Sequence, residues 1–105
     1  MSHDYDEQRR ETLASFKAMK GVQLPEQAEI DFVFFVEELD ADWAAAEAAL
    51  QQAGFRTRRD PDDDNLIARF GPMPLTPDAI WDRERAATEI ALRHEFYPDG
   101  WDIVE

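Results

Sequence analysis

The sequence contains no cysteine and has few basic residues, glycines and serines. Without cysteine, neither a disulfide framework nor a thiolate metal site can form. Only 11 Lys and Arg residues accompany 24 Asp and Glu residues, which gives a formal net charge of -13. A phosphate backbone repels a surface with this excess of carboxylates, so we expect no direct binding of nucleic acid.

Long apolar segments are also missing. The longest nearly apolar run, Phe32 to Val36, is far too short to span a bilayer. Residues 1–7 contain neither the basic nor the apolar stretch of a signal peptide, and neither end carries a lipidation motif. We therefore expect a cytoplasmic protein with no membrane partner.

The residues that usually carry catalysis are scarce or isolated. Ser2 and Ser15 are the only serines, and neither lies in a nucleophile elbow. The four glycines are too scattered to form a phosphate-binding loop. His94 is expected to end a helix, where a cation is favourable without any catalytic role. No carboxylate pair is distinguished from the rest, so the sequence predicts no enzyme, no catalytic residue and no cofactor, and a small carboxylate enzyme is the least favoured interpretation.

The apolar content that is present predicts a folded domain. Hydrophobic residues make up 44% of the chain and aromatic residues 11%, well above the content of a disordered acidic tail. A chain of 105 residues has room for one hydrophobic core. We expect a single domain over residues 1–105, in which residues 1–27 form a leading helix and a linker.

The first half of the chain predicts a helix followed by a strand. Leu13, Phe16 and Met19 recur at helical spacing within residues 5–20. Residues 30–36 are rich in β-branched and aromatic side chains, with apolar residues on both faces, as in a central strand.

The middle of the chain predicts a second helix and a hairpin. Asp40 is expected to cap a helix over residues 40–53, which Gly54 ends. Two short strands, residues 55–59 and 66–70, enclose a polar turn and form the hairpin.

The last third predicts a stiff loop, a helix and a final strand. Three prolines within residues 71–77 argue against regular structure there. Thr76 and Pro77 suit the N-cap and first position of a helix that runs to about His94. Strand-like segments then surround a turn at residues 98–101.

This order of elements predicts an α+β fold. Strand, helix, strand, strand, helix and strand form a ferredoxin-like sandwich, with a four-stranded antiparallel sheet and two helices on one face. The leading helix is expected to cover part of the other face, near Val33 and Phe35.

The acidic run from Asp60 to Asn65 suggests either a calcium loop or a solvated turn. It lacks the glycine and the distal glutamate of an EF-hand loop, so the turn is favoured and no metal is expected. Four arginines on the flanking strands could neutralise these carboxylates; they are Arg56, Arg58, Arg59 and Arg69. The alternative is that they hold a phosphate or a stretch of RNA, which is less favoured because four bases and four acids leave the segment neutral.

Four short motifs resemble one known family. They are the strand Asp31–Val36, the helix end Ala53-Gly54-Phe55, the helix entry Met73–Pro77 and the terminal Tyr97-Pro-Asp-Gly-Trp101. Together they resemble the regulator of ribonuclease activity B (RraB) family, the ribonuclease E inhibitor proteins. The resemblance implies a small acidic α+β protein without catalytic activity, which binds the endoribonuclease that starts messenger decay and reduces its cleavage.

A cationic partner of this kind would be attracted to the stretch from Glu26 to Glu47, which holds eight acids and no base. Aromatic residues beside a turn are also typical of protein-binding hot spots. The expected partner-binding residues are Glu37, Glu38, Asp40, Asp42, Glu47, Tyr97, Asp99 and Trp101. The alternative is a general interaction module or a self-associating one, which uses the sheet face around Val33 and Phe35.

Overall fold

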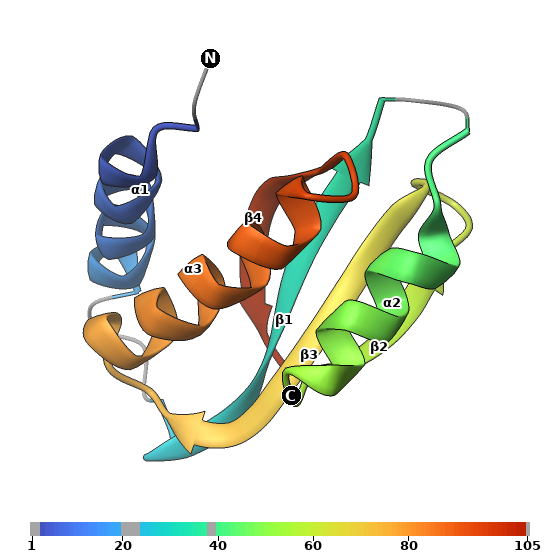
Figure 1. Ribbon diagram of the computed structural model, residues 1–105. Coiled ribbons are helices and arrows are strands. Elements are labelled where there is room, and N and C mark those ends of the chain that lie inside the picture. Colours follow the sequence, from blue (N-terminus) through green and yellow to red (C-terminus); the bar gives the residue numbers. More distant parts are fainter. Residues whose placement is uncertain (1–2, 20–23, 38–39, 105) are drawn as a thin grey trace.

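The computed structural model describes residues 3–19, 24–37 and 40–104. It contains three helices and four strands within these ranges (Figure 1). In chain order they are α1 (Tyr5–Ala18), β1 (Gln27–Val36), α2 (Trp43–Gln52), β2 (Arg56–Asp60), β3 (Asn65–Pro74), α3 (Pro77–Leu92) and β4 (Phe96–Ile103).

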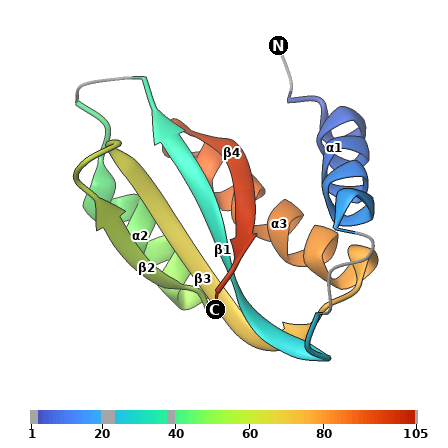
Figure 2. The same cartoon turned by 180° about the vertical axis from the view of Figure 1, so that it is seen from behind.

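The four strands form one antiparallel sheet in the order β2-β3-β1-β4. Each of the helices α2 and α3 connects two strands that have one other strand between them. Both helices lie on the same face of the sheet (Figure 1), and the opposite face is open (Figure 2). The predicted ferredoxin-like α+β sandwich is therefore confirmed.

The central strand β1 supplies the middle of the core. Ile30, Phe32 and Phe34 point toward the helices and are at most 1% exposed. They pack with Leu50 of α2 and with residues of α3 and β4. Because side chains alternate along a strand, the residues between them lie on the open face.

Helix α1 packs on α3 and lies beside the free edge of β4 (Figure 2). The prediction that it covers the open face is wrong, and Val33 and Phe35 are only half-buried there. The most buried residues of α1 are polar: Gln8 donates to Thr88 at 2.9 Å, and Thr12 donates to Glu84. Helix α3 offers polar partners to α1, which is why this polar side of α1 is the more buried one.

Helix α2 begins later than predicted. Asp42, not Asp40, is the N-cap, and its carboxylate accepts a hydrogen bond from the Ala45 amide at 3.0 Å. Gly54 has a φ of +97° directly after the C-cap, as predicted for a glycine that ends the helix.

Strand β3 continues through residues that were predicted to be irregular. It runs to Pro74, and Ala28 of β1 pairs with Met73. The register shifts between Ala28 and Ile30, so that two residues of β3, Gly71 and Pro72, lie opposite Glu29 alone. A cis peptide bond joins these two residues. A bulge accommodates proline and a glycine of positive φ without ending the strand.

Strand β4 is likewise one strand and not two pieces around a turn. Pro98 pairs with Phe34, and Trp101 pairs with Phe32, so the residues between them form a second bulge. Proline is tolerated because β4 is an edge strand.

The remaining predictions for local structure hold closely. Asp60 pairs with Asn65 across the predicted hairpin turn. The Thr76 hydroxyl accepts from the Ala79 amide at the start of α3, with Pro77 in the first position. The helix ends at Leu92, two residues before His94.

Candidate functional site

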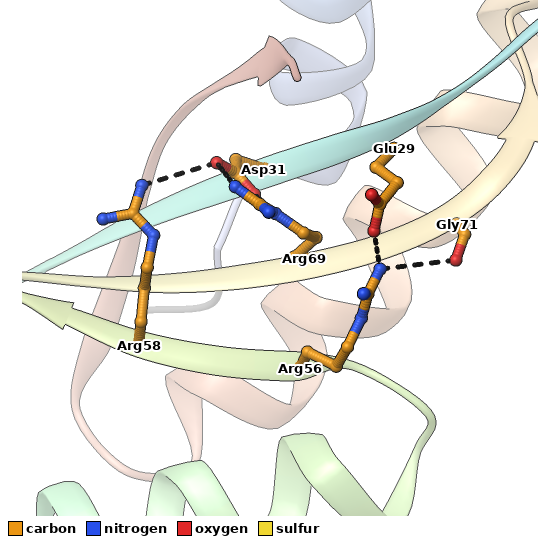
Figure 3. Close-up of polar contacts among 6 residues, drawn as sticks. All are labelled: Glu29, Asp31, Arg56, Arg58, Arg69 and Gly71. Carbon is orange, nitrogen blue, oxygen red and sulfur yellow. Dashed lines mark hydrogen bonds and ion pairs between the residues drawn. The ribbon is translucent and has the colours of Figure 1, made fainter. Parts of the chain in front are cut away.

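The open face of the sheet carries a network of ion pairs (Figure 3). Asp31 of β1 is only 8% exposed and accepts two hydrogen bonds from Arg69 of β3, at 2.8 and 3.1 Å. Arg58 of β2 approaches the same carboxylate at 3.5 Å. Hydrogen bonding to Asp31 raises the pKa of Arg69. Two guanidinium groups thus compensate for the burial of one carboxylate.

Two more arginines are paired with acids of the stretch from Glu26 to Glu47, which contains no base. Arg56 contacts Glu29 and lies 3.4 Å from the Gly71 carbonyl oxygen (Figure 3). On the other face, Arg59 donates to Glu47 of α2 at 2.7 and 3.2 Å. The prediction that these arginines neutralise the hairpin turn is wrong. Arg56, Arg58 and Arg69 pair with acids of β1, and Arg59 pairs with Glu47 of α2.

These pairs change the meaning of the charge pattern. Glu29, Asp31 and Glu47 belong to the stretch that has no base in sequence, yet each has an arginine beside it in space. These pairs are not visible in the sequence, because the arginines are far along the chain from their acids. They belong to β2 and β3, and the sheet and the packing of α2 on β2 bring them close. The stretch is consequently less negative than its sequence indicates.

The predicted acidic contact residues have different surroundings. Glu37 and Asp40 are exposed near the connection between β1 and α2. Asp42 is exposed and caps α2, and Glu47 is paired with Arg59. Glu38 lies outside the described residues.

The predicted aromatic contact residues lie on opposite faces of β4. Tyr97 packs on Phe35 at the open face, with ring centroids 5.6 Å apart. Trp101 pairs with Phe32 and packs against the core from the helix side. Asp99, between them in the sequence, is exposed.

A groove of about 640 Å³ lies between α1 and β4, and Glu84 of α3 contributes to it. Figure 2 shows β4 with β1 on one side and α1 across from its free edge. The groove is lined by residues of α1 and its N-terminal flank and by consecutive residues of β4, with one residue each from β1 and α3. They are His3, Asp4, Glu7, Gln8, Glu11, Thr12, Ser15, Val33, Glu84 and Pro98 to Asp102.

The groove is strongly acidic. Six of its lining residues are carboxylic acids, and within the described ranges no Lys or Arg lines it. The acids are Asp4, Glu7, Glu11, Glu84, Asp99 and Asp102. This is unlike the open face, where Arg56, Arg58 and Arg69 are paired with acids.

Glu84 is the most buried of these acids, at 3% exposed. Burial raises its pKa, and nearby Glu11 adds to this effect. Polar contacts with Thr12 and Gln8 and the proximity of His3 lower the pKa and offset part of the shift. The carboxylate therefore lies in a polar pocket between two helices and borders the groove.

Most of the groove acids were not among the predicted site residues; only Asp99 was. Asp4, Glu7 and Glu11 recur at intervals of three and four, so a helical projection of the polar residues would have placed them on one face. The position of that face opposite β4 is a tertiary property that no local spacing reveals.

The described part of the chain offers no group of three His, Asp or Glu residues placed to hold a metal ion. Among the helices within the same ranges, none combines the length and the apolar character needed to cross a bilayer. The candidate sites are therefore two surfaces that differ in charge: the open sheet face with its ion pairs, and the acidic groove between α1 and β4.

Comparison with known proteins identifies a family. A search of curated proteins found no similar protein. A family model described as regulator of ribonuclease activity B matches residues 6–103, from the first turn of α1 to the end of β4. This confirms the resemblance that the strand and turn motifs indicated. The match spans nearly the whole chain, and the chain therefore belongs to the regulator of ribonuclease activity B family.

Proposed function

We propose that this chain is a non-catalytic acidic regulator that binds an endoribonuclease of the ribonuclease E type in the cytoplasm and inhibits it. The observation that carries the proposal is membership of the ribonuclease-regulator family over residues 6–103. Inhibition of this type lowers the rate of RNA decay.

Electrostatics supports a cationic partner. The chain carries a formal net charge of -13, and ribonucleases that bind RNA need positively charged segments for the phosphate backbone. An acidic protein competes with RNA for such segments, and long-range attraction speeds its association at low salt. The proposed mechanism is therefore occupation of cationic segments and not chemical action on RNA.

The expected contact residues contribute unequally to this attraction. Glu37, Asp40, Asp42 and Asp99 are exposed and carry charge at the surface. Glu47 shares its charge with Arg59 and contributes less. Glu38 remains part of the proposed set; Tyr97 and Trp101 serve mainly as packing residues of β4.

The test is a cleavage assay with a purified ribonuclease E-type enzyme and a fluorescent RNA substrate. We expect the folded chain to slow cleavage at low ionic strength and to lose its effect as salt is added. A polyaspartate of matching charge is the control for simple competition by a polyanion. Undiminished cleavage at low salt would contradict the proposal, and equal inhibition by polyaspartate would show that charge alone, without the folded surface, accounts for the effect.

A second candidate function is self-association through the open sheet face. It is favoured by Phe35 and Tyr97, which pack together there and are only half-buried. Sedimentation over a wide concentration range tests it. A dimer that is lost on the change Phe35→Ser supports this candidate, and a monomer at every concentration removes it.

A further inference from the structure

The groove between α1 and β4 has two features that together indicate what kind of ligand it can bind. Its walls carry six carboxylic acids, with no Lys or Arg from the described ranges to balance them. Its other boundary is the outer edge of β4, which pairs with β1 alone among the described strands. An exposed strand edge presents backbone groups on which an extended peptide can add.

We propose that this groove binds an extended, arginine- or lysine-rich peptide segment, which lies along β4 with its basic side chains toward α1. The inference rests on the proposed function in one respect: the peptide segment is taken to come from a cationic region of the ribonuclease partner. It replaces the stretch from Glu26 to Glu47 as the principal docking site.

Charge complementarity selects this occupant. Glu7 and Glu11 are exposed on the α1 wall, and Asp99 and Asp102 are exposed on β4. A cationic side chain between these walls meets carboxylates from both sides, which favours guanidinium and ammonium groups.

The lining also favours a peptide over a free cation. Val33, Pro98 and Trp101 add apolar surface to the groove, which a peptide backbone and the aliphatic parts of Arg and Lys can cover. Strand β4 has eight residues, so a peptide of similar length can follow its edge.

The rival surface is less suited to this role. Glu29, Asp31 and Glu47 already have arginine partners. The other acids of the stretch within the described residues are exposed and dispersed, with Glu26 before β1 and Glu37, Asp40 and Asp42 before α2. A cationic peptide that bound to the paired acids would have to displace an arginine guanidinium. It would therefore gain less binding free energy there than in the groove.

Two matched variants test the assignment. The groove variant combines Glu7→Gln, Glu11→Gln and Asp99→Asn. The rival variant combines Glu37→Gln, Asp40→Asn and Asp42→Asn, in which asparagine keeps the capping ability of the helix start. Each variant removes three carboxylates, so the two proteins have equal net charge. Circular dichroism establishes that both are folded.

The probe is a fluorescent eight-residue peptide of alternating arginine and serine, titrated with each protein at low ionic strength. We expect the groove variant to bind about tenfold more weakly than the unchanged chain, and the rival variant to lose less than about threefold. Equal losses, or a larger loss for the rival variant, would overturn the groove assignment.

A second peptide tests the contribution of the strand edge. Methylation of alternate backbone nitrogens, on the edge that faces β4, keeps the charge and removes the donors needed for strand addition. We expect this peptide to bind severalfold more weakly than its unmethylated form, whereas equal affinity would contradict binding along β4.

The peptide assay separates this inference from the proposed function. If the unchanged chain does not bind the arginine peptide, the groove inference fails whatever the ribonuclease does. If the peptide binds in the groove but RNA cleavage by the ribonuclease is unaffected, the groove stands and the proposed function fails.

Discussion

Arg69 of β3 donates two hydrogen bonds to Asp31 of β1, from Nε to Oδ1 and from Nη2 to Oδ2. The two residues are direct neighbours in the strand register. In the same row across the open face, Asp102 of β4 lies on the far side of Asp31, and Arg56 of β2 lies on the far side of Arg69. Two acids and two bases therefore span the four strands.

Removal of the Asp31 charge is expected to destabilise the fold. The change Asp31→Asn leaves Arg69 and Arg58 without their shared anion, and we expect a loss of about 1–3 kcal/mol in the free energy of unfolding. Urea denaturation measures the loss. The control Asp63→Asn removes the same charge from an exposed turn and should alter stability by less than about 0.5 kcal/mol. Equal effects of the two changes would contradict a structural role for the Asp31 network.

The start of α2 gives a second prediction. The change Asp42→Ala removes the acceptor for the Ala45 amide, so we expect it to lower the free energy of unfolding by about 1 kcal/mol. Asp40 is two residues earlier and is not the N-cap, so Asp40→Ala is the matched control and should be close to neutral. Thermal unfolding of the two variants side by side measures this, and a larger loss for Asp40→Ala would restore the original sequence prediction.

The two bulge glycines allow steric crowding to be separated from backbone strain. Gly71 has a φ of +130°, and a Cβ there would come within 2.9 Å of the Ala28 carbonyl oxygen. Gly100 has a φ of +102°, but a Cβ there would meet no atom within 4 Å. We expect Gly100→Ala to cost about 1–2 kcal/mol through strain alone, and Gly71→Ala to cost more. Chemical denaturation that finds equal losses would show that β1 moves aside freely at Ala28.

Glu84 gives a prediction about pH. Because burial raises its pKa in the folded state, the folded protein binds the proton more tightly than the unfolded chain does. The stability that this proton provides is complete below the unfolded pKa, near 4.5, and is lost as the pH rises through the higher folded value.

The variant Glu84→Gln tests this assignment. Glutamine is neutral and can still accept the hydrogen bond from Thr12. We expect the stability of the variant, relative to the unchanged chain, to increase as the pH rises from 4.5 to neutrality, measured by urea unfolding at each pH. The control is Asp82→Asn, which removes a charge from an exposed position of the same helix. A relative stability that stays constant with pH would show that Glu84 titrates at its ordinary pKa.

Patterns within single elements were predictable from the sequence. The alternation from Ile30 to Val36 identified the central strand, and Thr76-Pro77 identified the start of α3. Each depends on backbone geometry and burial over a few residues, which a local pattern contains. The order of such elements was then sufficient for the topology.

The features that were mispredicted depend on contacts between distant residues. The segment after Gly71 remains in a strand because β1 pairs with Met73 and Pro74 beyond the bulge. Arg58 and Arg69 neutralise Asp31 because the register places them opposite it or near it. The groove exists because α1 packs on α3 through Thr12 and Glu84, residues that are 72 positions apart. None of these pairings has a signature in the local sequence.

The polar attachment of α1 has a consequence for the kinetics of binding. Its most buried residues, Gln8 and Thr12, can exchange their partners on α3 for water, whereas the strands are held by a continuous apolar core. Local opening therefore needs less free energy at α1 than in the sheet, and its amide protons should exchange with solvent first. Since α1 forms one wall of the groove, each opening releases whatever the groove holds. Each charge of the segment that contacts α1 makes such an opening rarer in the complex, so residence time depends both on the packing of α1 and on the contacts that the segment makes with it.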